Sequence, residues 1–334
     1  MHVWRAHVKR ILRPASALLA SAVVLFSGRA LGQASPDQQL IIFHAGSLTV
    51  PFEKIIAGFR EEHPGVKVLK EIAGSRECAR KISELHLPCD VFASADYKVI
   101  DNLLIPEYAK WNLKFATNEM AIVYTDKSRR AKEINAGNWF DILRDKDVLY
   151  GRSDPNVDPC GYRTILTMKL AERYYGVRGL TQELLKKDTE YIRPMEVDLL
   201  ALLEIGELDY IFIYRSVAEQ HHLKYLILPD QINLKNPGME NSYKQVSVVL
   251  NGKKPGETIT QAGAPMVYGV TIPKDAPNPS LARAFVCYLL DKNKGLKVMA
   301  EMGQPTVVPA LCPTYDKLPD ELRQFATIPK QDNH

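Results

Sequence analysis

Residues 153–164 read SDPNVDPCGYRT, and this stretch organises the rest of the chain. Its first half is rich in turn-forming residues, and Asp158 then stands directly before Pro159. Because Asp is a preferred N-cap and Pro is preferred at the first helical position, a helix is predicted to begin here and to end at Gly176. Its apolar face is marked at intervals of four by Tyr162, Leu166, Leu170 and Tyr174. The unpaired N–H groups at the start of such a helix favour an anion.

Two similar corners occur earlier in the chain, at Gly46-Ser47 and Gly74-Ser75. Glycine allows the backbone to approach a ligand closely, and the serine adds an N–H and a hydroxyl at a helix start. Both corners follow predicted strands, and open α/β sheets bind ligands at the carboxyl ends of their strands. We therefore predict that the three corners face one cleft and hold one oxyanion. The alternative interpretation is that each serine is only an N-cap.

Strands and helices alternate along the first part of the chain. Apolar runs at 40–43, 66–72 and 90–94 are separated by segments with helical periodicity, which predicts a parallel α/β layer. A second unit begins at 118–124, and further strands are predicted at 148–150, 210–214 and 266–272. The pattern is weakest at 229–263, and the last twenty residues read as a loose tail.

The first 32 residues differ from the rest. A basic start precedes the mostly apolar run Ala15–Phe26, and Ala30-Leu31-Gly32 supplies small residues for cleavage. This pattern predicts a secretory signal peptide, with a single N-terminal anchor as the alternative. The segment holds five Lys or Arg and no acidic residue, so the remainder has 38 basic and 39 acidic residues, a net charge of −1. Nucleic-acid binding therefore loses its compositional support.

Catalytic motifs find little support in the sequence. It contains no G-x-S-x-G, H-E-x-x-H or P-loop pattern, and His44 near Ser47 matches no triad spacing. An odd number of cysteines, five, leaves at least one unpaired or paired between chains. Cys160 is interpreted as a small packed residue of the first helical turn. Without further information, Asp158 is interpreted as a helix cap and Glu196 as a first-turn acid that complements its helix dipole. Tyr214 is interpreted either as a half-buried residue at a strand end or as a hydroxyl donor to a ligand.

Taken together, the motifs resemble those of the extracytoplasmic molybdate/tungstate-binding proteins of ABC importers, in the archaeal-type branch. The resemblance covers nearly all of the chain after the predicted signal peptide. The segments that carry it are FHAGSLT (43–49), AGS (73–75), DVFASADY (90–97), DPCGYR (158–163), GELDYIFIYRSVA (206–218), VYGVTIPK (267–274) and GQP (303–305).

The resemblance implies an α/β, two-lobed periplasmic-binding-protein fold of type II, with a hinge and a ligand cleft between the lobes. The first lobe would comprise 36–118 plus 274–334, and the second 119–273. In that branch two carboxylates complete a six-oxygen shell around the metal of the oxyanion, and by motif they correspond to Asp158 and Glu196. Ser47, Ser75 and Tyr214 would bind the oxo groups. Relatives carry a longer insertion between the two carboxylate motifs, and the roles of Arg76 and Glu77 stay open.

The resemblance also resolves a physical puzzle, because carboxylates should repel an oxyanion. Two unit charges about 4 Å apart interact by roughly 1 kcal/mol in water and about 4 kcal/mol at an intermediate dielectric. Mo(VI) and W(VI) can expand from four to six oxygen ligands, whereas the central atoms of sulfate and phosphate do not. Two carboxylates would then bind the metal and also exclude sulfate.

We therefore expect a periplasmic, monomeric receptor that delivers molybdate or tungstate to a membrane permease and its ATPase. It would need no cofactor besides that ligand, bind no nucleic acid and not be an enzyme. The competing hypotheses are a receptor for another tetrahedral anion such as sulfate, and a secreted hydrolase that uses Asp158 and Glu196.

Overall fold

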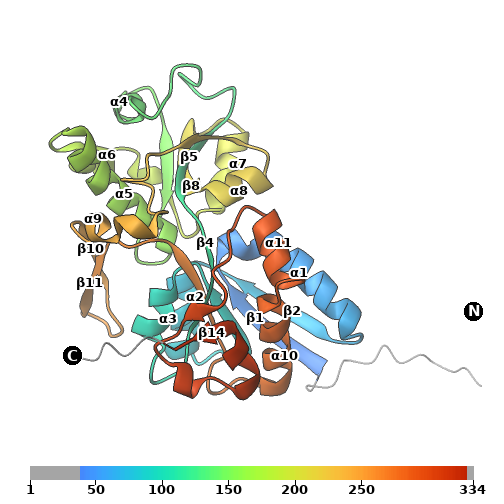
Figure 1. Cartoon of the computed structure of the whole chain (residues 1–334). Helices are drawn as coiled ribbons and strands as arrows, with labels where there is room; N and C mark the ends of the chain where they lie inside the picture. The colour runs from blue at the N-terminus through green and yellow to red at the C-terminus, as the bar shows by residue number, and fades with distance from the viewer. Residues whose placement is uncertain (1–37, 329–334) are drawn as a thin grey trace, which may run out of the picture. The chain divides into compact units, whose positions relative to one another are not determined.

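Two five-stranded sheets organise the chain in a computed structural model that describes residues 38–328 (Figure 1). The predicted signal peptide, residues 1–32, lies outside the described residues. Both sheets belong to one compact unit, Ala34–His334.

The first sheet has the order β2-β1-β3-β12-β4. Its strands are β1 (Gln39–His44), β2 (Lys67–Ile72), β3 (Val91–Ser94), β4 (Leu113–Thr117) and β12 (Val267–Thr271). β1 pairs in parallel with β2 and β3, as predicted, whereas β12 runs antiparallel to β3 and β4. The sequence-based boundary at 273 is therefore wrong for β12, which belongs to the first sheet. A strand pattern gives no information on which sheet the strand joins, so this error has a simple origin.

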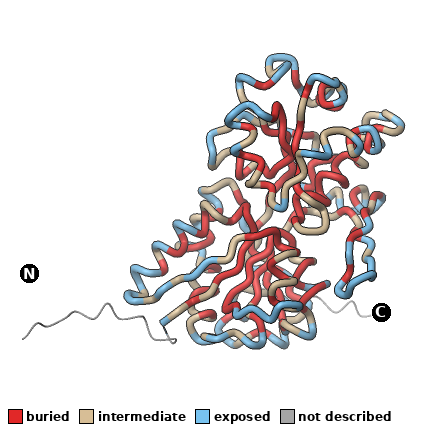
Figure 2. Tube along the Cα trace, turned by 180° about the vertical axis from the view of Figure 1, so that it is seen from behind, coloured by how far each residue is buried: buried red, intermediate tan, exposed pale blue. Residues whose placement is uncertain are grey.

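Helices cover both faces of the first sheet (Figure 1). One face carries α1 (Thr49–Glu62), α10 (Pro279–Leu290) and α11 (Gly295–Glu301), and the other carries α2 (Ser75–Ser83) and α3 (Tyr97–Leu103). Phe59 and Phe285 join α1 to α10, with ring centroids 5.2 Å apart in an edge-on arrangement. The buried residues in Figure 2 concentrate on the strands and on the inner sides of these helices.

The second sheet has the order β7-β6-β8-β5-β9. Its strands are β5 (Met120–Tyr124), β6 (Tyr150–Ser153), β7 (Ile192–Arg193), β8 (Tyr210–Tyr214) and β9 (Lys224–Ile227). Its helices are α4 (Trp139–Arg144), α5 (Pro159–Tyr175), α6 (Leu180–Lys186), α7 (Asp198–Glu204) and α8 (Arg215–Gln220), with the short 3₁₀ helix η3 (Thr189–Tyr191). Phe212 is central to this core, because its ring lies 5.9 Å from those of both Trp139 and Tyr150.

The segment with the weakest sequence pattern contains a two-stranded hairpin, β10 (Ser247–Asn251) and β11 (Thr258–Ala262), preceded by η4 (Pro237–Met239) and α9 (Glu240–Tyr243). The pattern is weak because much of this hairpin is exposed. The expectation of a loose C-terminal tail is wrong for the described part. There β13 (Ala310–Leu311) pairs with β14 (Ala326–Thr327), η5 (Tyr315–Lys317) and η6 (Asp320–Phe325) lie between them, and Leu318 and Leu322 are buried.

Candidate functional site

The corner at 153–164 folds as its sequence predicts. Helix α5 begins at Pro159, and Asp158 caps it, because Asp158 Oδ1 accepts a hydrogen bond of 3.2 Å from the N–H of Cys160. Gly176 ends the helix in a left-handed conformation with φ of 70°. Cys160 is fully buried and its Sγ lies 3.6 Å from the carbonyl oxygen of Phe212. It is a packed residue, as expected, and all five cysteines are unpaired within the described residues.

The second oxygen of Asp158 connects this corner to Glu196. Asp158 Oδ2 accepts a hydrogen bond of 3.1 Å from the N–H of Glu196, so the carboxylate is more than a cap. Glu196 itself lies in the turn before α7 and is 0% exposed, and neither of its carboxyl oxygens has a hydrogen-bond partner among the described residues. Because α7 begins at Asp198, Glu196 lies outside its first turn, and the interpretation of Glu196 as only a first-turn acid is wrong.

Burial dominates the protonation of this pair. It raises the pKa of Glu196 well above the usual value, and the charge of Asp158 raises it further. Burial also raises the pKa of Asp158, against the effect of its hydrogen-bond donors. Two buried carboxyl groups side by side stabilise a proton or a positively charged centre between them.

The two Gly-Ser corners lie against the same pair. A Cβ on Gly46 would stand 3.2 Å from Oε2 of Glu196, and a Cβ on Gly74 would stand 2.5 Å from the carbonyl oxygen of Val157. Glycine is needed at residue 74 because a backbone atom of another element occupies the space of a side chain. The three corners predicted from the sequence therefore meet at one place.

Neither serine is an N-cap, which excludes the alternative interpretation. The residue that caps α1 is Leu48, and the residue that caps α2 is Gly74. Ser47 lies in the 3₁₀ helix η2 (Gly46–Leu48), and its Oγ accepts a hydrogen bond of 3.1 Å from the hydroxyl of Tyr268. Ser75 is the first residue of α2, and its Oγ accepts a hydrogen bond of 2.9 Å from the N–H of Ala95.

Tyr214 ends β8 and is buried, and its hydroxyl accepts a hydrogen bond of 3.0 Å from Nη1 of Arg163. The same Nη1 atom donates to the carbonyl oxygen of Ala95 at 2.8 Å, and Nη2 lies 3.3 Å from Oδ2 of Asp96. The Tyr162 hydroxyl donates to that carboxylate oxygen at 2.5 Å. Two residues of the DPCGYR motif thus bind the end of β3 in the first sheet.

Several of these residues were not predicted from the sequence to belong to the site. They all stand in segments that carry the family resemblance, namely Asp96, Tyr162, Arg163, Tyr268 and Gln304. Only their membership in long motifs could have indicated them, because a buried polar side chain has no periodic signature in a single sequence.

Arg76, whose role the sequence left open, connects α2 to the loop before α5 and to the end of β10. Its exposed fraction is 2%, and its guanidinium donates to the carbonyl oxygens of Asn156, at 3.2 Å, and Asn251. Arg80, one turn later, donates to Asn156 O at 2.9 Å. The backbone N–H of Arg76 also donates to Val157 O at 3.1 Å. The first turn of α2 is therefore bound to the loop that precedes α5.

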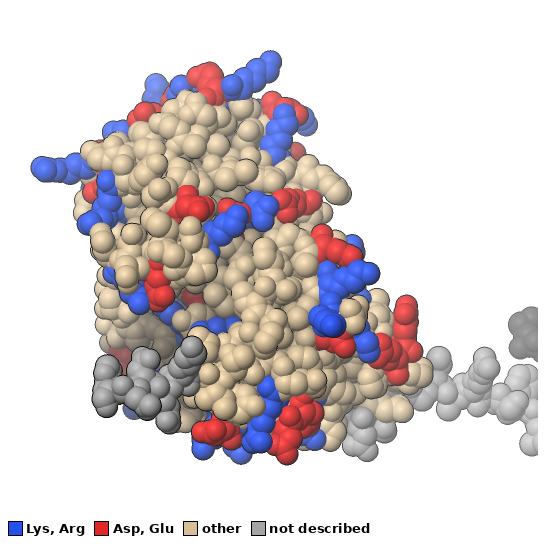
Figure 3. Space-filling view, in the orientation of Figure 1, with Lys and Arg blue, Asp and Glu red and all other residues tan. Residues whose placement is uncertain are grey.

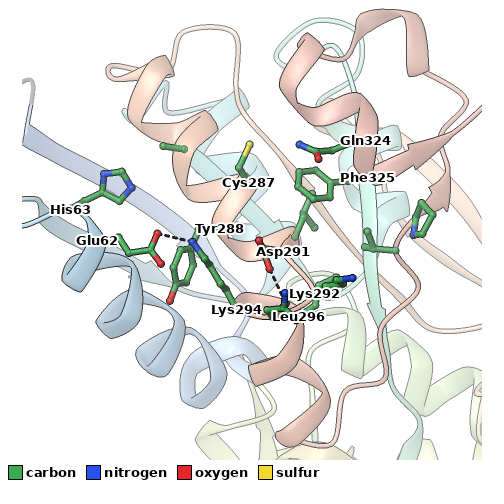
Figure 4. Close-up of a pocket in the computed structure, with 15 residues that line it drawn as sticks. Glu62, His63, Cys287, Tyr288, Asp291, Lys292, Lys294, Leu296, Gln324 and Phe325 are labelled. Atoms are coloured by element: carbon green, nitrogen blue, oxygen red, sulfur yellow. Dashed lines mark hydrogen bonds and ion pairs between the residues drawn. The ribbon is translucent and has the colours of Figure 1, made fainter.

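A cavity of about 370 Å³ is lined by Gly46, Val197 and residues of α1, α7 and α8, and by none of the five predicted site residues. A larger cavity of about 540 Å³ lies between α1, α10 and the C-terminal segment, where Glu62 pairs with Lys294 at 2.6 Å (Figure 4). Neither cavity is lined by a predicted site residue, so cavity size does not locate the site.

Other features of the described residues add no competing site. Within them no group of three or more His, Cys, Asp or Glu side chains has a metal-binding arrangement. No helix among them has the length and apolar character required to span a membrane. Acidic and basic side chains alternate over the face in Figure 3, without a field of one sign.

Comparisons with known proteins identify the family of the chain. A family model described as a bacterial extracellular solute-binding protein matches residues 40–303. The chain belongs to this family. An uncharacterised solute-binding protein of Petrotoga mobilis is 50% identical over 86% of this chain and 89% of its own length. The molybdate/tungstate-binding protein WtpA of Pyrococcus abyssi is 41% identical over 87% of this chain and 90% of its own.

Solved structures confirm the predicted fold class. The periplasmic molybdate-binding protein of Azotobacter vinelandii superposes with a TM-score of 0.59 at 17% identity, over 81% of this chain and 99% of that chain. The sulfate-binding protein SubI of Mycobacterium tuberculosis superposes with a TM-score of 0.56 at 13% identity, over 87% of this chain and 92% of that chain. The fold is therefore the two-lobed α/β fold of periplasmic binding proteins.

Proposed function

We propose that this protein captures molybdate or tungstate outside the cytoplasm and delivers it to the permease and ATPase of an ABC importer. The observation that carries the proposal is the buried pair Asp158–Glu196, in which both Glu196 carboxyl oxygens lack hydrogen-bond partners among the described residues. The relative from Pyrococcus abyssi, named a molybdate/tungstate-binding protein, supports the choice of ligand.

The chemistry of the pair selects among oxyanions. An unpartnered buried carboxylate costs several kcal/mol unless a proton or cationic centre neutralises it. Molybdenum and tungsten in the +6 state accept two additional oxygen ligands, so the carboxylates can bind the metal. Sulfur in sulfate accepts none, and both carboxylates would then face its oxygens with an unfavourable interaction of about 4 kcal/mol per charge pair at 4 Å.

The remaining residues would bind the oxo groups. Ser47 and Ser75 approach from the first sheet with hydroxyls at helix starts, and Tyr214 approaches from the second. Asp158 and Glu196 would provide the fifth and sixth oxygens. A ligand held by both sheets favours the closed arrangement by its differential affinity for it.

Titration calorimetry on the purified protein tests the proposal directly. Molybdate and tungstate should bind with nanomolar affinity, about −12 kcal/mol, and sulfate far more weakly. Sulfate binding within about tenfold of molybdate, a difference of about 1.4 kcal/mol, would contradict the metal-ligation argument and favour a general tetrahedral-anion receptor.

We also propose that the protein is not an enzyme, acts as a monomer and resides in the periplasm after removal of residues 1–32. The competing hydrolase hypothesis requires Asp158 and Glu196 to serve as an acid and a base. Incubation with phosphate and sulfate esters separates the two, because a receptor releases no alcohol product.

A further inference from the structure

Three hydroxyl groups of the site share one unusual hydrogen-bonding state. Each accepts a hydrogen bond from a protein donor: Ser47 from the Tyr268 hydroxyl, Ser75 from the Ala95 N–H, and Tyr214 from Arg163 Nη1. None of the three donates its own proton to an acceptor in residues 38–328. A hydroxyl carries one proton and two acceptor lone pairs, so each of these groups keeps a proton that is available to an anion.

The direction of the hydrogen bond at Ser47 is fixed by a series of hydrogen bonds that begins at Asn118. The Asn118 Oδ1 atom accepts from the N–H of Glu119 at 2.9 Å, so its Nδ2 must face the other way. There Nδ2 donates to the Tyr268 hydroxyl at 2.9 Å and to Ser216 Oγ at 2.7 Å. The orientation of the Asn118 amide is therefore determined by its neighbours.

Gln304 provides a second donor to the Tyr268 hydroxyl and so helps to fix the direction in which that hydroxyl donates. Its Nε2 donates to the carbonyl oxygen of Ser47 at 3.0 Å, which is an acceptor only, and lies 3.4 Å from the Tyr268 hydroxyl. With donors from Asn118 and Gln304 on its oxygen, the Tyr268 hydroxyl has Ser47 Oγ as the acceptor for its own proton, at 3.1 Å. All four residues are buried, so no solvent competes for these bonds.

We infer that Tyr268 is a positioning residue, which directs the hydroxyl proton of Ser47 onto the bound oxyanion. This inference rests on the proposed function for the location of the ligand, but it applies to any tetrahedral anion at that place. A donor that already points at the anion has lost its orientational freedom before binding, and hydrogen bonds in a chain polarise one another. Asn118 lies between β4 and β5, where the polypeptide passes from one sheet to the other. The series of hydrogen bonds therefore connects this crossing segment to the ligand.

A double-mutant cycle on the full-length purified protein tests the inference, with molybdate, tungstate, sulfate and phosphate as probes. Tyr268→Phe removes the donor and keeps the ring, and it should weaken the tightest-binding anion by about three- to tenfold. In the Ser47→Ala background the same change should alter affinity by less than about twofold, because the group through which it acts is absent. Equal losses in both backgrounds, or no loss from Tyr268→Phe alone, would overturn the inference.

Tyr150→Phe is the matched control, since Tyr150 is also buried and its hydroxyl donates to the carbonyl oxygen of Leu184, away from the site. It should lower the melting temperature and leave anion affinity unchanged. Carbon-13 labelling at the tyrosine ring carbon that bears the hydroxyl adds a spectroscopic readout. The Tyr268 signal, identified by its loss in Tyr268→Phe, should shift on anion addition in the wild type and not in Ser47→Ala.

The outcomes separate the inference from the proposed function. If sulfate or phosphate proves to be the tightest-binding anion, the molybdate proposal fails and the cycle still tests Tyr268 with that anion. If molybdate binds tightly but the cycle is additive, the inference fails and the proposed function stands. If no anion binds or shifts the Tyr268 signal, both are refuted.

Discussion

Replacement of Glu196 by Gln should have opposite effects on the protein with and without its ligand. Glu196 is fully buried and unpartnered, and its pKa is raised well above the usual value. Each unit of that rise costs the folded protein about 1.4 kcal/mol at a pH above it. The unliganded variant should therefore be more stable than the wild type, with a higher melting temperature, at a pH above about 4.5.

The liganded variant should lose affinity for molybdate and tungstate. Removing one partner from a buried charged interaction costs about 3–5 kcal/mol, which is roughly 10²- to 4 × 10³-fold in the dissociation constant. A neutral amide oxygen is a poorer donor to a high-valent metal than a carboxylate. Sulfate affinity should rise or stay constant, because sulfate gains nothing from the charge that is removed.

Calorimetric titration and thermal unfolding, each with and without molybdate, measure both effects. Glu204→Gln is the control, since Glu204 is exposed at the end of α7 and the change removes the same charge from the same region. It should shift stability and affinity by less than about 0.5 kcal/mol. Unchanged molybdate affinity in the Glu196 variant would refute the ligation argument, and so would an equal loss for sulfate.

Four further outcomes follow from the same geometry. Asp158→Asn can keep the helix cap, but its amide nitrogen cannot accept from the Glu196 N–H, so it should lower stability by about 1–3 kcal/mol and weaken molybdate binding. X-ray absorption should find six oxygen neighbours in the wild type and four in the double amide variant. Ser75→Ala should cost about 1.5–3 kcal/mol of anion affinity by calorimetry; no change would leave its hydroxyl without a role. Because the folded pKa of Glu196 is raised from 4.5, the stability of the unliganded wild type should fall as pH rises above about 4.5 and through the folded pKa. The melting temperature of Glu196→Gln minus that of the wild type should then grow with pH, and a constant difference would contradict the burial argument. Gly74→Ala places a Cβ 2.5 Å from Val157 O, so small-angle scattering with molybdate should record a more open protein than the wild type.

Local signals in the sequence were sufficient for the elements around the central corner. The Asp158-Pro159 pair placed the start of α5, and Gly176 placed its end, because caps depend on a few neighbouring residues. The hairpin β10–β11 and the packed C-terminal segment were not recognised, since their strands are short and half exposed. The sheet that β12 joins depends on contacts between distant residues, about which a strand pattern contains no information.

The candidate site was predictable only in part. Gly-Ser corners indicated where Ser47 and Ser75 stand, but their capping and ligand roles could not be separated without the bonds from Tyr268 and Ala95. Glu196 had no local signal beyond its motif, because the property that distinguishes it is burial without a partner. The role of Arg76 was left open because its hydrogen-bond acceptors lie 80 and 175 residues away in sequence.

The bonds of Arg76 and Arg80 have a consequence for the conditions in which the protein can work. Both guanidinium groups reach across to backbone carbonyls, of Asn156 and of the start of the hairpin turn, which are neutral acceptors. Dissolved ions screen pairs of exposed charges strongly, with a Debye length of about 8 Å at 0.15 M, but act much less on a buried charge and a dipole in contact. The contact that the buried Arg76 makes with the loop before α5 and with the hairpin should therefore hold in both dilute and saline surroundings. This property suits a receptor that works outside the cytoplasm, where the cell does not regulate the ionic strength.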